Sequence, residues 1–126
     1  MPPTGKKIVI VEDDAGLHQA FKRVLNAAGR SPFIFGSAEA LLAEGPIEDT
    51  ECYVLDVRLP GKSGIELGRE LFASCPGVPM IFITAHDEPW VHEAARECGA
   101  AAVLIKPFAG RKLLDTIRIA TTKSEA

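Results

Sequence analysis

Five short apolar runs, separated by longer amphipathic stretches, constrain the fold of this chain more than any other feature. The runs are four residues long and occupy positions 8–11, 32–35, 52–55, 80–83 and 102–105. Their length and their β-branched and aromatic side chains are typical of strands buried on both faces. Apolar residues between the runs recur at helical spacing, as in Leu17, Phe21, Val24, Leu25 and Ala28 and in Val91, Ala94, Ala95 and Cys98. This alternation predicts a doubly wound α/β fold, with a five-stranded parallel sheet and helices on both faces.

Capping residues mark the ends of the predicted helices. Gly29 and Gly99 follow the first and fourth helical patterns, where glycine commonly ends a helix. Side chains that favour the N-cap position precede four of the patterns, at Asp14, Ser37, Ser63 and Asp87. No linker or repeat interrupts the β–α units, so we expect one domain over residues 1–126. Its core spans about residues 7–121, and we expect the polar residues from Thr121 onward, chiefly 122–126, to form a frayed tail.

Composition excludes several classes of protein. The 126 residues are 47% hydrophobic and 25% charged, which is ordinary for one globular domain. Fourteen basic against seventeen acidic residues give a net charge of −3, the wrong sign for direct nucleic-acid binding. No apolar run approaches the roughly 20 residues of a membrane span, and no signal peptide is recognisable, so we expect a cytoplasmic protein. The three separated cysteines, Cys52, Cys75 and Cys98, indicate packing residues rather than disulfides or a zinc site.

Polar side chains follow four of the five predicted strands. The first strand ends in the acidic run 12–14, the third in Asp56, the fourth in Thr84 and the fifth in Lys106. Because the ligand site of an open parallel sheet lies beyond the carboxyl ends of its strands, we expect these groups to converge.

Carboxylates that converge in this way require a cation. Two like charges about 4 Å apart cost about 4 kcal/mol at an effective dielectric constant of about 20. Glu12, Asp13 and Asp56 offer only hard oxygen ligands, and their small number leaves room for water and a phosphate oxygen. This favours Mg²⁺ over Ca²⁺, which usually takes more protein oxygens, and over zinc, which prefers His or Cys. Asp14 is assigned to helix capping instead.

Lys106 and Thr84 extend the predicted metal site to phosphoryl transfer. An ammonium group and a hydroxyl can hold phosphoryl oxygens that the metal leaves free. Asp56 would then be the nucleophile and form an aspartyl phosphate, a reaction that needs no general base.

Four motifs at the strand ends resemble the receiver domain of bacterial two-component response regulators. They are IVIVEDD at 8–14, YVLDVRLPGKSG at 53–64, ITA at 83–85 and KPF at 106–108. The resemblance extends from about Lys7 to Thr121 and implies the flavodoxin-like (CheY-like) strand order 2-1-3-4-5. It also implies a protein that is not an enzyme in the usual sense, because it catalyses only its own phosphorylation and dephosphorylation.

The resemblance implies a role for each residue of the acidic site. Asp56 would accept a phosphoryl group from a histidine kinase, and Asp13 and Asp56 would ligate Mg²⁺ directly. Glu12 would act through a metal-bound water, and Arg58 would contribute its backbone carbonyl oxygen.

The family pattern also assigns roles around the phosphoryl group. Thr84 and Lys106 would bind phosphoryl oxygens, the bond before Pro107 would be cis, and Pro60 and Gly64 would shape the loop after Asp56.

Three side-chain positions concern the phosphoryl lifetime and the output. Arg58 and His86 occupy positions that tune phosphoryl lifetime in the family. Val103 stands where receivers usually carry a tyrosine or phenylalanine that acts as a rotameric switch. The resemblance therefore leaves the phosphorylation chemistry intact and the output mechanism open.

Three conspicuous residues of the helices receive no role in the site. His18 and His92 are interpreted as exposed helix residues, since no metal-ligand pair stands near either. Trp90, the only tryptophan, is interpreted as a packing residue, with a partly exposed anchor for a partner as the alternative.

Two hypotheses about function remain within the family. The chain as given favours a free-standing receiver that signals by contact with a downstream protein, because six residues after Ala120 cannot form a helix-turn-helix. The alternative is the receiver half of a DNA-binding transcription factor.

An FMN-binding flavodoxin-like protein is a remote alternative, because the turn after the first strand is acidic rather than phosphate-binding. A nicotinamide-binding domain lacks its glycine motif, and an aspartate-nucleophile phosphatase would need a carboxylate where Arg58 stands.

Overall fold

The computed structural model describes residues 6–125, in which strands and helices alternate along the chain. The strands are β1 (Lys6–Val11), β2 (Arg30–Phe35), β3 (Thr50–Asp56), β4 (Met80–Thr84) and β5 (Ala102–Ile105). The helices are α1 (Ala15–Ala27), α2 (Ala38–Glu44), α3 (Gly64–Ser74), α4 (Pro89–Glu97) and α5 (Gly110–Glu125). Every predicted apolar run lies within a strand.

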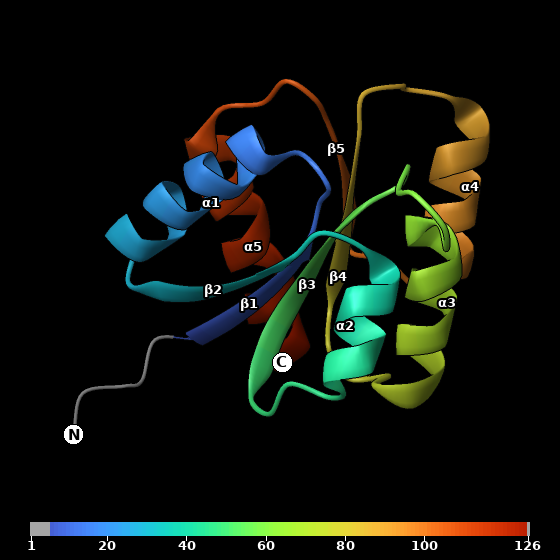
Figure 1. Cartoon of the computed structure of the whole chain (residues 1–126), viewed down its shortest axis with the longest axis horizontal. Helices are drawn as coiled ribbons and strands as arrows, with labels where there is room; N and C mark the ends of the chain where they lie inside the picture. The colour runs from blue at the N-terminus through green and yellow to red at the C-terminus, as the bar shows by residue number, and fades with distance from the viewer. Residues whose placement is uncertain (1–5, 126) are drawn as a thin grey trace.

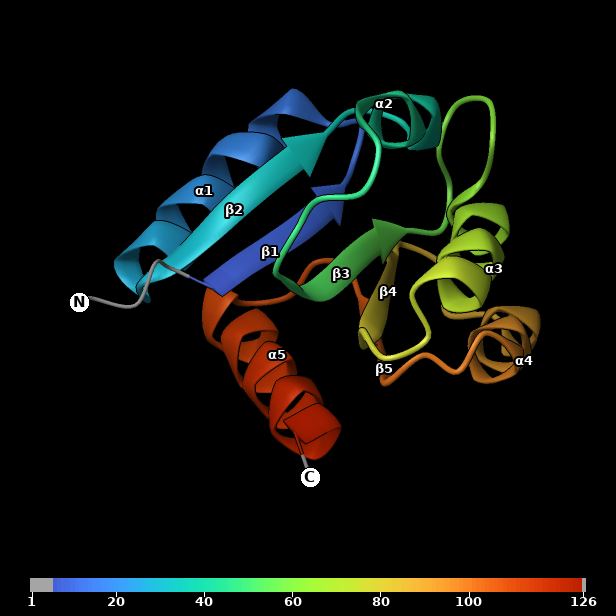
Figure 2. The ribbon, with the colours of Figure 1, turned by 90° about the horizontal axis from the view of Figure 1, so that it is seen from below.

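The five strands form one parallel sheet in the order β2-β1-β3-β4-β5. Helices α1 and α5 cover one face of the sheet, and α2, α3 and α4 cover the other (Figures 1 and 2). The strand order reverses at β1, whose neighbours are β2 and β3, so the carboxyl ends of β1 and β3 flank the switch point of the sheet. This confirms the predicted doubly wound fold and its strand order.

Alternate residues of each central strand enter two separate hydrophobic cores. Ile8 and Ile10 pack toward α1 and α5, whereas Val9 and Val11 pack toward α2, α3 and α4. The interpretation of every strand as buried on both faces is wrong for β2 and β5, which are only half-buried along most of their length. The reason is topological, because these two strands lie at the edges of the sheet.

Three of the four predicted N-caps are present. The side chain of Asp14 accepts hydrogen bonds from the N–H groups of Gly16 and Leu17. Ser37 caps α2, and Ser63 forms a capping box with Glu66.

The prediction of Asp87 as the N-cap of α4 is wrong. The N-cap is Glu88, which makes no side-chain capping bond, and Pro89 begins the helix. The carboxylate of Asp87 instead contacts Nε2 of His92 at 2.6 Å. At the helix ends, Gly29 and Gly99 have φ angles of 78° and 70°, as expected of glycines that stop a helix.

The C-terminal segment differs from the predicted frayed tail. Helix α5 continues to Glu125, and Thr121 is buried with its hydroxyl donating to the carbonyl oxygen of Ile117 at 2.9 Å. Because the Thr121 hydroxyl finds its acceptor within α5, the polar composition of this segment does not end the helix. Ala126 lies outside the described residues.

The cysteines are free, as expected. Burial raises the pKa of Cys52 to about 12, which is consistent with an inert packing residue. Within residues 6–125, no helix has the length and apolar character that a membrane crossing requires.

Candidate functional site

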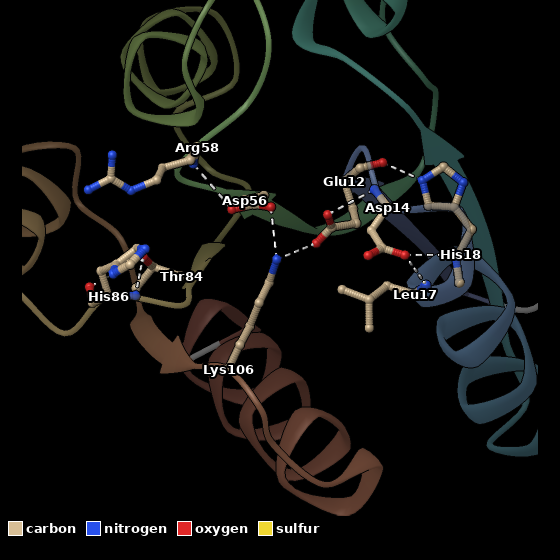
Figure 3. A network of polar contacts seen from close by, with 10 residues as sticks. Glu12, Asp14, Leu17, His18, Asp56, Arg58, Thr84, His86 and Lys106 are labelled. Carbon is tan, nitrogen blue, oxygen red and sulfur yellow. Dashed lines mark hydrogen bonds and ion pairs between the residues drawn. The ribbon is translucent and has the colours of Figure 1, made fainter.

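The carboxyl ends of β1, β3 and β5 bring together four of the predicted site residues. Glu12 directly follows β1, Asp56 ends β3, and Lys106 directly follows β5 (Figure 3). The carboxylates of Glu12 and Asp56 are buried, with 1% and 5% of each residue exposed, whereas Asp13 is exposed. The site therefore combines two buried carboxylates with one that is exposed to solvent.

Lys106 holds the two buried carboxylates together. Its Nζ lies 2.8 Å from Oε1 of Glu12 and 2.9 Å from Oδ2 of Asp56. Burial alone would lower the pKa of Lys106, but its hydrogen bonds and charge attraction with these carboxylates outweigh burial and raise the pKa. Lys106 is therefore cationic at neutral pH, where it offsets part of the repulsion between the acids.

Backbone N–H groups fix the orientation of both buried carboxylates. The N–H of Arg58 donates to Oδ1 of Asp56 at 3.2 Å, and the N–H of Asp14 donates to Oε2 of Glu12 at 3.1 Å. Each carboxylate is thus held by one backbone donor and by Lys106, an arrangement that restricts both rotamers.

Glu12, Asp13 and Asp56 fit a hard divalent cation. One carboxylate oxygen from each residue lies within 4.8 Å of the other two. The donors are all oxygens, and the described ion pairs join a single ammonium group, that of Lys106, to two of the three carboxylates. A cation at this position would complete the charge balance of the cluster.

Gly64 seats the start of α3 directly on the backbone of Asp56. A Cβ atom added to Gly64 would lie 1.8 Å from the carbonyl oxygen of Asp56, closer than any side chain can approach. The N–H of Gly64 also donates to the carbonyl oxygen of Val57 at 3.0 Å. Gly64 thus holds the stem of the β3–α3 loop (residues 57–63), in which Pro60 is exposed.

Comparison with known proteins decides the family. The model of the response regulator receiver domain matches residues 8–118, which include every strand end described above. The chain belongs to the response regulator receiver family.

Relatives and solved structures of receivers agree with this assignment. Nodulation protein W of Bradyrhizobium diazoefficiens is 36% identical over 116 residues, which cover 92% of this chain and 51% of that protein. The transcriptional regulatory protein FixJ of the same organism is 32% identical and covers 94% of this chain and 58% of that protein. The chain thus spans about half the length of these two curated relatives. A crystal structure of a CheY-like receiver domain protein from Methanospirillum hungatei JF-1 superposes with a TM-score of 0.90 at 28% identity, covering 96% of this chain and 97% of that one.

Thr84 of the receiver is turned toward its own loop. The residue is buried, and its hydroxyl accepts from the N–H of His86 at 3.1 Å and faces the carbonyl oxygen of His86 at 3.3 Å. No described hydrogen bond joins Thr84 to Asp56. The His86 side chain is exposed beside this turn. In the geometry described, Thr84 and His86 are near the site without engaging the carboxylate.

The Arg58 side chain points away from Asp56 (Figure 3). Its guanidinium group pairs with Oε1 of Glu88 at 2.9 Å, which joins the β3–α3 loop to the residue that precedes α4. Sequence reasoning missed Glu88, and no motif marks it. The Glu88 side chain contacts Arg58 and makes no capping bond to α4.

The switch position of the receiver holds a half-buried valine. Val103 packs against the core on the side of α2, α3 and α4, in the middle of β5. The peptide bond between Lys106 and Pro107 is cis, in agreement with the family pattern.

His18 and Trp90 differ from their sequence-based interpretations. His18 is half-buried rather than exposed, and its Nε2 contacts the backbone carbonyl oxygen of Glu12. His92 is exposed, as expected. Trp90 is 49% exposed at the start of α4, where it lines a cavity of about 480 Å³ beside Arg58. Packing therefore accounts for only part of the indole ring.

Proposed function

We propose that this receiver accepts a phosphoryl group on Asp56 from a histidine kinase, with Mg²⁺ held by Glu12, Asp13 and Asp56. The observation that carries the proposal is the contact of 2.9 Å between Lys106 and the Asp56 carboxylate, beside two further acids. The chain is a phosphoacceptor rather than an enzyme that acts on other substrates.

A carboxylate oxygen of Asp56 is the nucleophile. It attacks phosphorus, a new P–O bond forms, and the P–N bond to the donor histidine breaks with its electron pair leaving on the imidazole. Mg²⁺, when bound, supplies positive charge to the phosphoryl oxygens. Lys106 supplies a second positive charge and holds Asp56 in one orientation through the transfer. Hydrolysis later removes the group: water attacks phosphorus, the bond between phosphorus and the Asp56 oxygen breaks, and the Asp56 carboxylate and inorganic phosphate are released.

Thr84 contributes a hydroxyl once it leaves its present partner. Its bonds to His86 are within a two-residue turn, so a rearrangement of residues 85–88 would free the hydroxyl to donate to a phosphoryl oxygen. The guanidinium group of Arg58 is paired with Glu88. Arg58 can therefore tune the phosphoryl lifetime only after this ion pair breaks.

Phosphotransfer from a P–N donor tests the proposal. The chain is incubated with phosphoramidate, which has the bond type of phosphohistidine, and the products are separated on a gel that retards phosphoproteins. We expect a retarded band with Mg²⁺ and none with a chelator. The same pattern of bands under both conditions would contradict the proposed role of the metal.

Mg²⁺ should stabilise the chain by relieving repulsion among the three carboxylates. We expect the Tm to rise with Mg²⁺ concentration in the wild type, because the ion binds the folded site alone. Asp13→Ala should remove most of this dependence, and its Tm without metal should equal or exceed that of the wild type. Differential scanning calorimetry over a Mg²⁺ titration measures both effects. Equal stabilisation of wild type and Asp13→Ala would place the ion elsewhere.

The output partner is a downstream protein or a linked effector domain. The match covers only 51% of nodulation protein W and 58% of FixJ. This supports a linked effector domain, as in a receiver that is part of a transcription factor. Either arrangement places the domain in the cytoplasm, where a histidine kinase presents its phosphorylated residue.

Output should travel through α4 rather than through the position of Val103. Valine is too short and too restricted in its rotamers to follow Thr84 as an aromatic switch does. The Arg58–Glu88 ion pair offers a different link, from two residues beyond Asp56 to the start of α4. Phosphorylation would then shift residues 85–99 between two arrangements.

A phosphoryl mimic tests this route. With Mg²⁺ and beryllofluoride we expect Trp90 fluorescence and the amide shifts of residues 85–99 to change, and the shifts flanking Val103 to change less. Glu88→Gln should reduce the Trp90 response. A large response at Val103 with none around Trp90 would refute the route.

A further inference from the structure

We propose that Glu39, an exposed residue of α2, is a positioning residue that holds the tip of the β3–α3 loop in the arrangement that phosphorylation of Asp56 requires. This inference rests on the proposed function, and it assigns a role to a residue outside the motifs of the site.

The contact that carries the inference joins two segments that are distant in sequence. Oε2 of Glu39 accepts a hydrogen bond from the backbone N–H of Lys62 at 2.7 Å. This backbone bond lowers the pKa of Glu39, so the carboxylate is ionised and remains a strong acceptor at neutral pH.

Gly61 confirms how closely the carboxylate approaches the loop. A Cβ atom added to Gly61 would lie 2.6 Å from Oε2 of Glu39, and the φ angle of Gly61 is 74°, in the left-handed region. The backbone conformation therefore favours glycine at this position, and an added methyl group would displace the carboxylate of Glu39.

Helix α2 provides a firm base for this contact. Ser37 caps the helix by accepting from the N–H of Ala40, and the neighbouring residues Ala38 and Leu41 are buried in the core. Glu39 lies in the first turn, where a negative charge is favourable. The side chain thus projects from a fixed point toward the loop.

Backbone contacts hold the loop at three places, and side-chain pairs of Arg58 with Glu88 and of Lys62 with Glu70 add to them. The N–H of Arg58 donates to Asp56 at its beginning, Gly64 rests on Asp56 and Val57 at its end, and Glu39 holds Lys62 between them. Without the third contact, the backbone at the tip loses its bond to α2 and gains freedom to move, while the Lys62 side chain keeps its pair with Glu70 of α3. Arg58 lies between Asp56 and the tip, so motion of the tip reaches the backbone that orients Asp56 and that would face the metal.

Four forms of the full chain test the inference. Glu39→Ala removes the acceptor, Glu39→Gln keeps an oxygen that can accept from Lys62, and Gly61→Ala displaces the carboxylate from the opposite side. Glu44→Ala is the matched control, an exposed glutamate at the other end of α2 with no polar contact among the described residues.

Hydrogen exchange at the Lys62 amide provides a readout that is independent of activity. We expect exchange to accelerate about fivefold in Glu39→Ala, as the loss of one exposed hydrogen bond implies, and to stay near the wild-type rate in Glu39→Gln and Glu44→Ala. Gly61→Ala should accelerate it as well. In the wild type, Mg²⁺ with beryllofluoride should slow the exchange, because coupling between two sites is reciprocal.

The second readout is the Mg²⁺ concentration at half-maximal rise in Tm, together with the initial rate of labelling by acetyl phosphate. In Glu39→Ala we expect the Mg²⁺ midpoint to rise and the labelling rate to fall, each about threefold, with recovery in Glu39→Gln. Faster Lys62 exchange with an unchanged midpoint and rate would overturn the positioning role, and so would unchanged exchange. Failure of the wild type to take up phosphate would instead overturn the proposed function, together with this inference.

Discussion

Replacement of Asp56 by asparagine is expected to abolish phosphate incorporation. The amide oxygen of asparagine is not a nucleophile toward phosphorus, and Glu12 and Asp13 are expected to act as metal ligands rather than as acceptors. With labelled acetyl phosphate and Mg²⁺, the wild type should gain phosphate that survives acid and is lost in base, and the variant should gain none.

Two controls separate loss of chemistry from loss of structure. Asp115→Asn, which changes a half-exposed aspartate of α5, should label at the wild-type rate. The thermal stability of Asp56→Asn without metal should equal or exceed that of the wild type, because one of three close negative charges is gone. Full labelling of a folded Asp56→Asn would show that another residue accepts the phosphoryl group.

Gly64→Ala should be the most damaging small substitution in the site. The new methyl group would meet the carbonyl oxygen of Asp56 at 1.8 Å, so either α3 or the end of β3 must move. Overpacking of this kind costs about 3 kcal/mol of unfolding free energy or somewhat more, since both neighbours are backbone. Urea unfolding measures the loss, and labelling of the folded fraction should be slower than in the wild type.

Gly36→Ala is the matched control for this substitution. Its added Cβ would meet nothing within 4 Å, so we expect a change in unfolding free energy of at most about 0.5 kcal/mol. Similar stability of Gly64→Ala and Gly36→Ala would mean that α3 does not rest on the backbone of Asp56.

The architecture was predictable because its determinants are local. Runs such as Ile8–Val11 (8–11) have the length and composition of central strands, and Ser63 with Glu66 forms the capping box that its spacing allows. The half-burial of β2 and β5 was not predictable from their apolar runs, because edge position is a property of the sheet rather than of the strand. The N-cap position of α4 follows locally from Pro89, which favours the first helical position, whereas the contacts of Glu88 with Arg58 and of Asp87 with His92 were not predictable.

The site also has a part that was predictable from the sequence and a part that was not. The convergence of Glu12, Asp56 and Lys106 follows from the ends of parallel strands, so the sequence predicts it without knowledge of any loop. The contacts Arg58–Glu88 and Glu39–Lys62 join residues 30 and 23 positions apart through side chains on loops or exposed helix faces. Their geometry depends on how those loops fold over the sheet, and no residue pattern encodes it.

Intact-mass spectrometry of the chain after incubation with acetyl phosphate tests phosphoacceptance by Asp56 most directly. The sample with Mg²⁺ should gain one phosphoryl group, the sample with a chelator should gain none, and peptide mapping after borohydride reduction should place the modification at Asp56. An unchanged mass with Mg²⁺, or a phosphoryl group on a peptide that lacks Asp56, would contradict the proposed function.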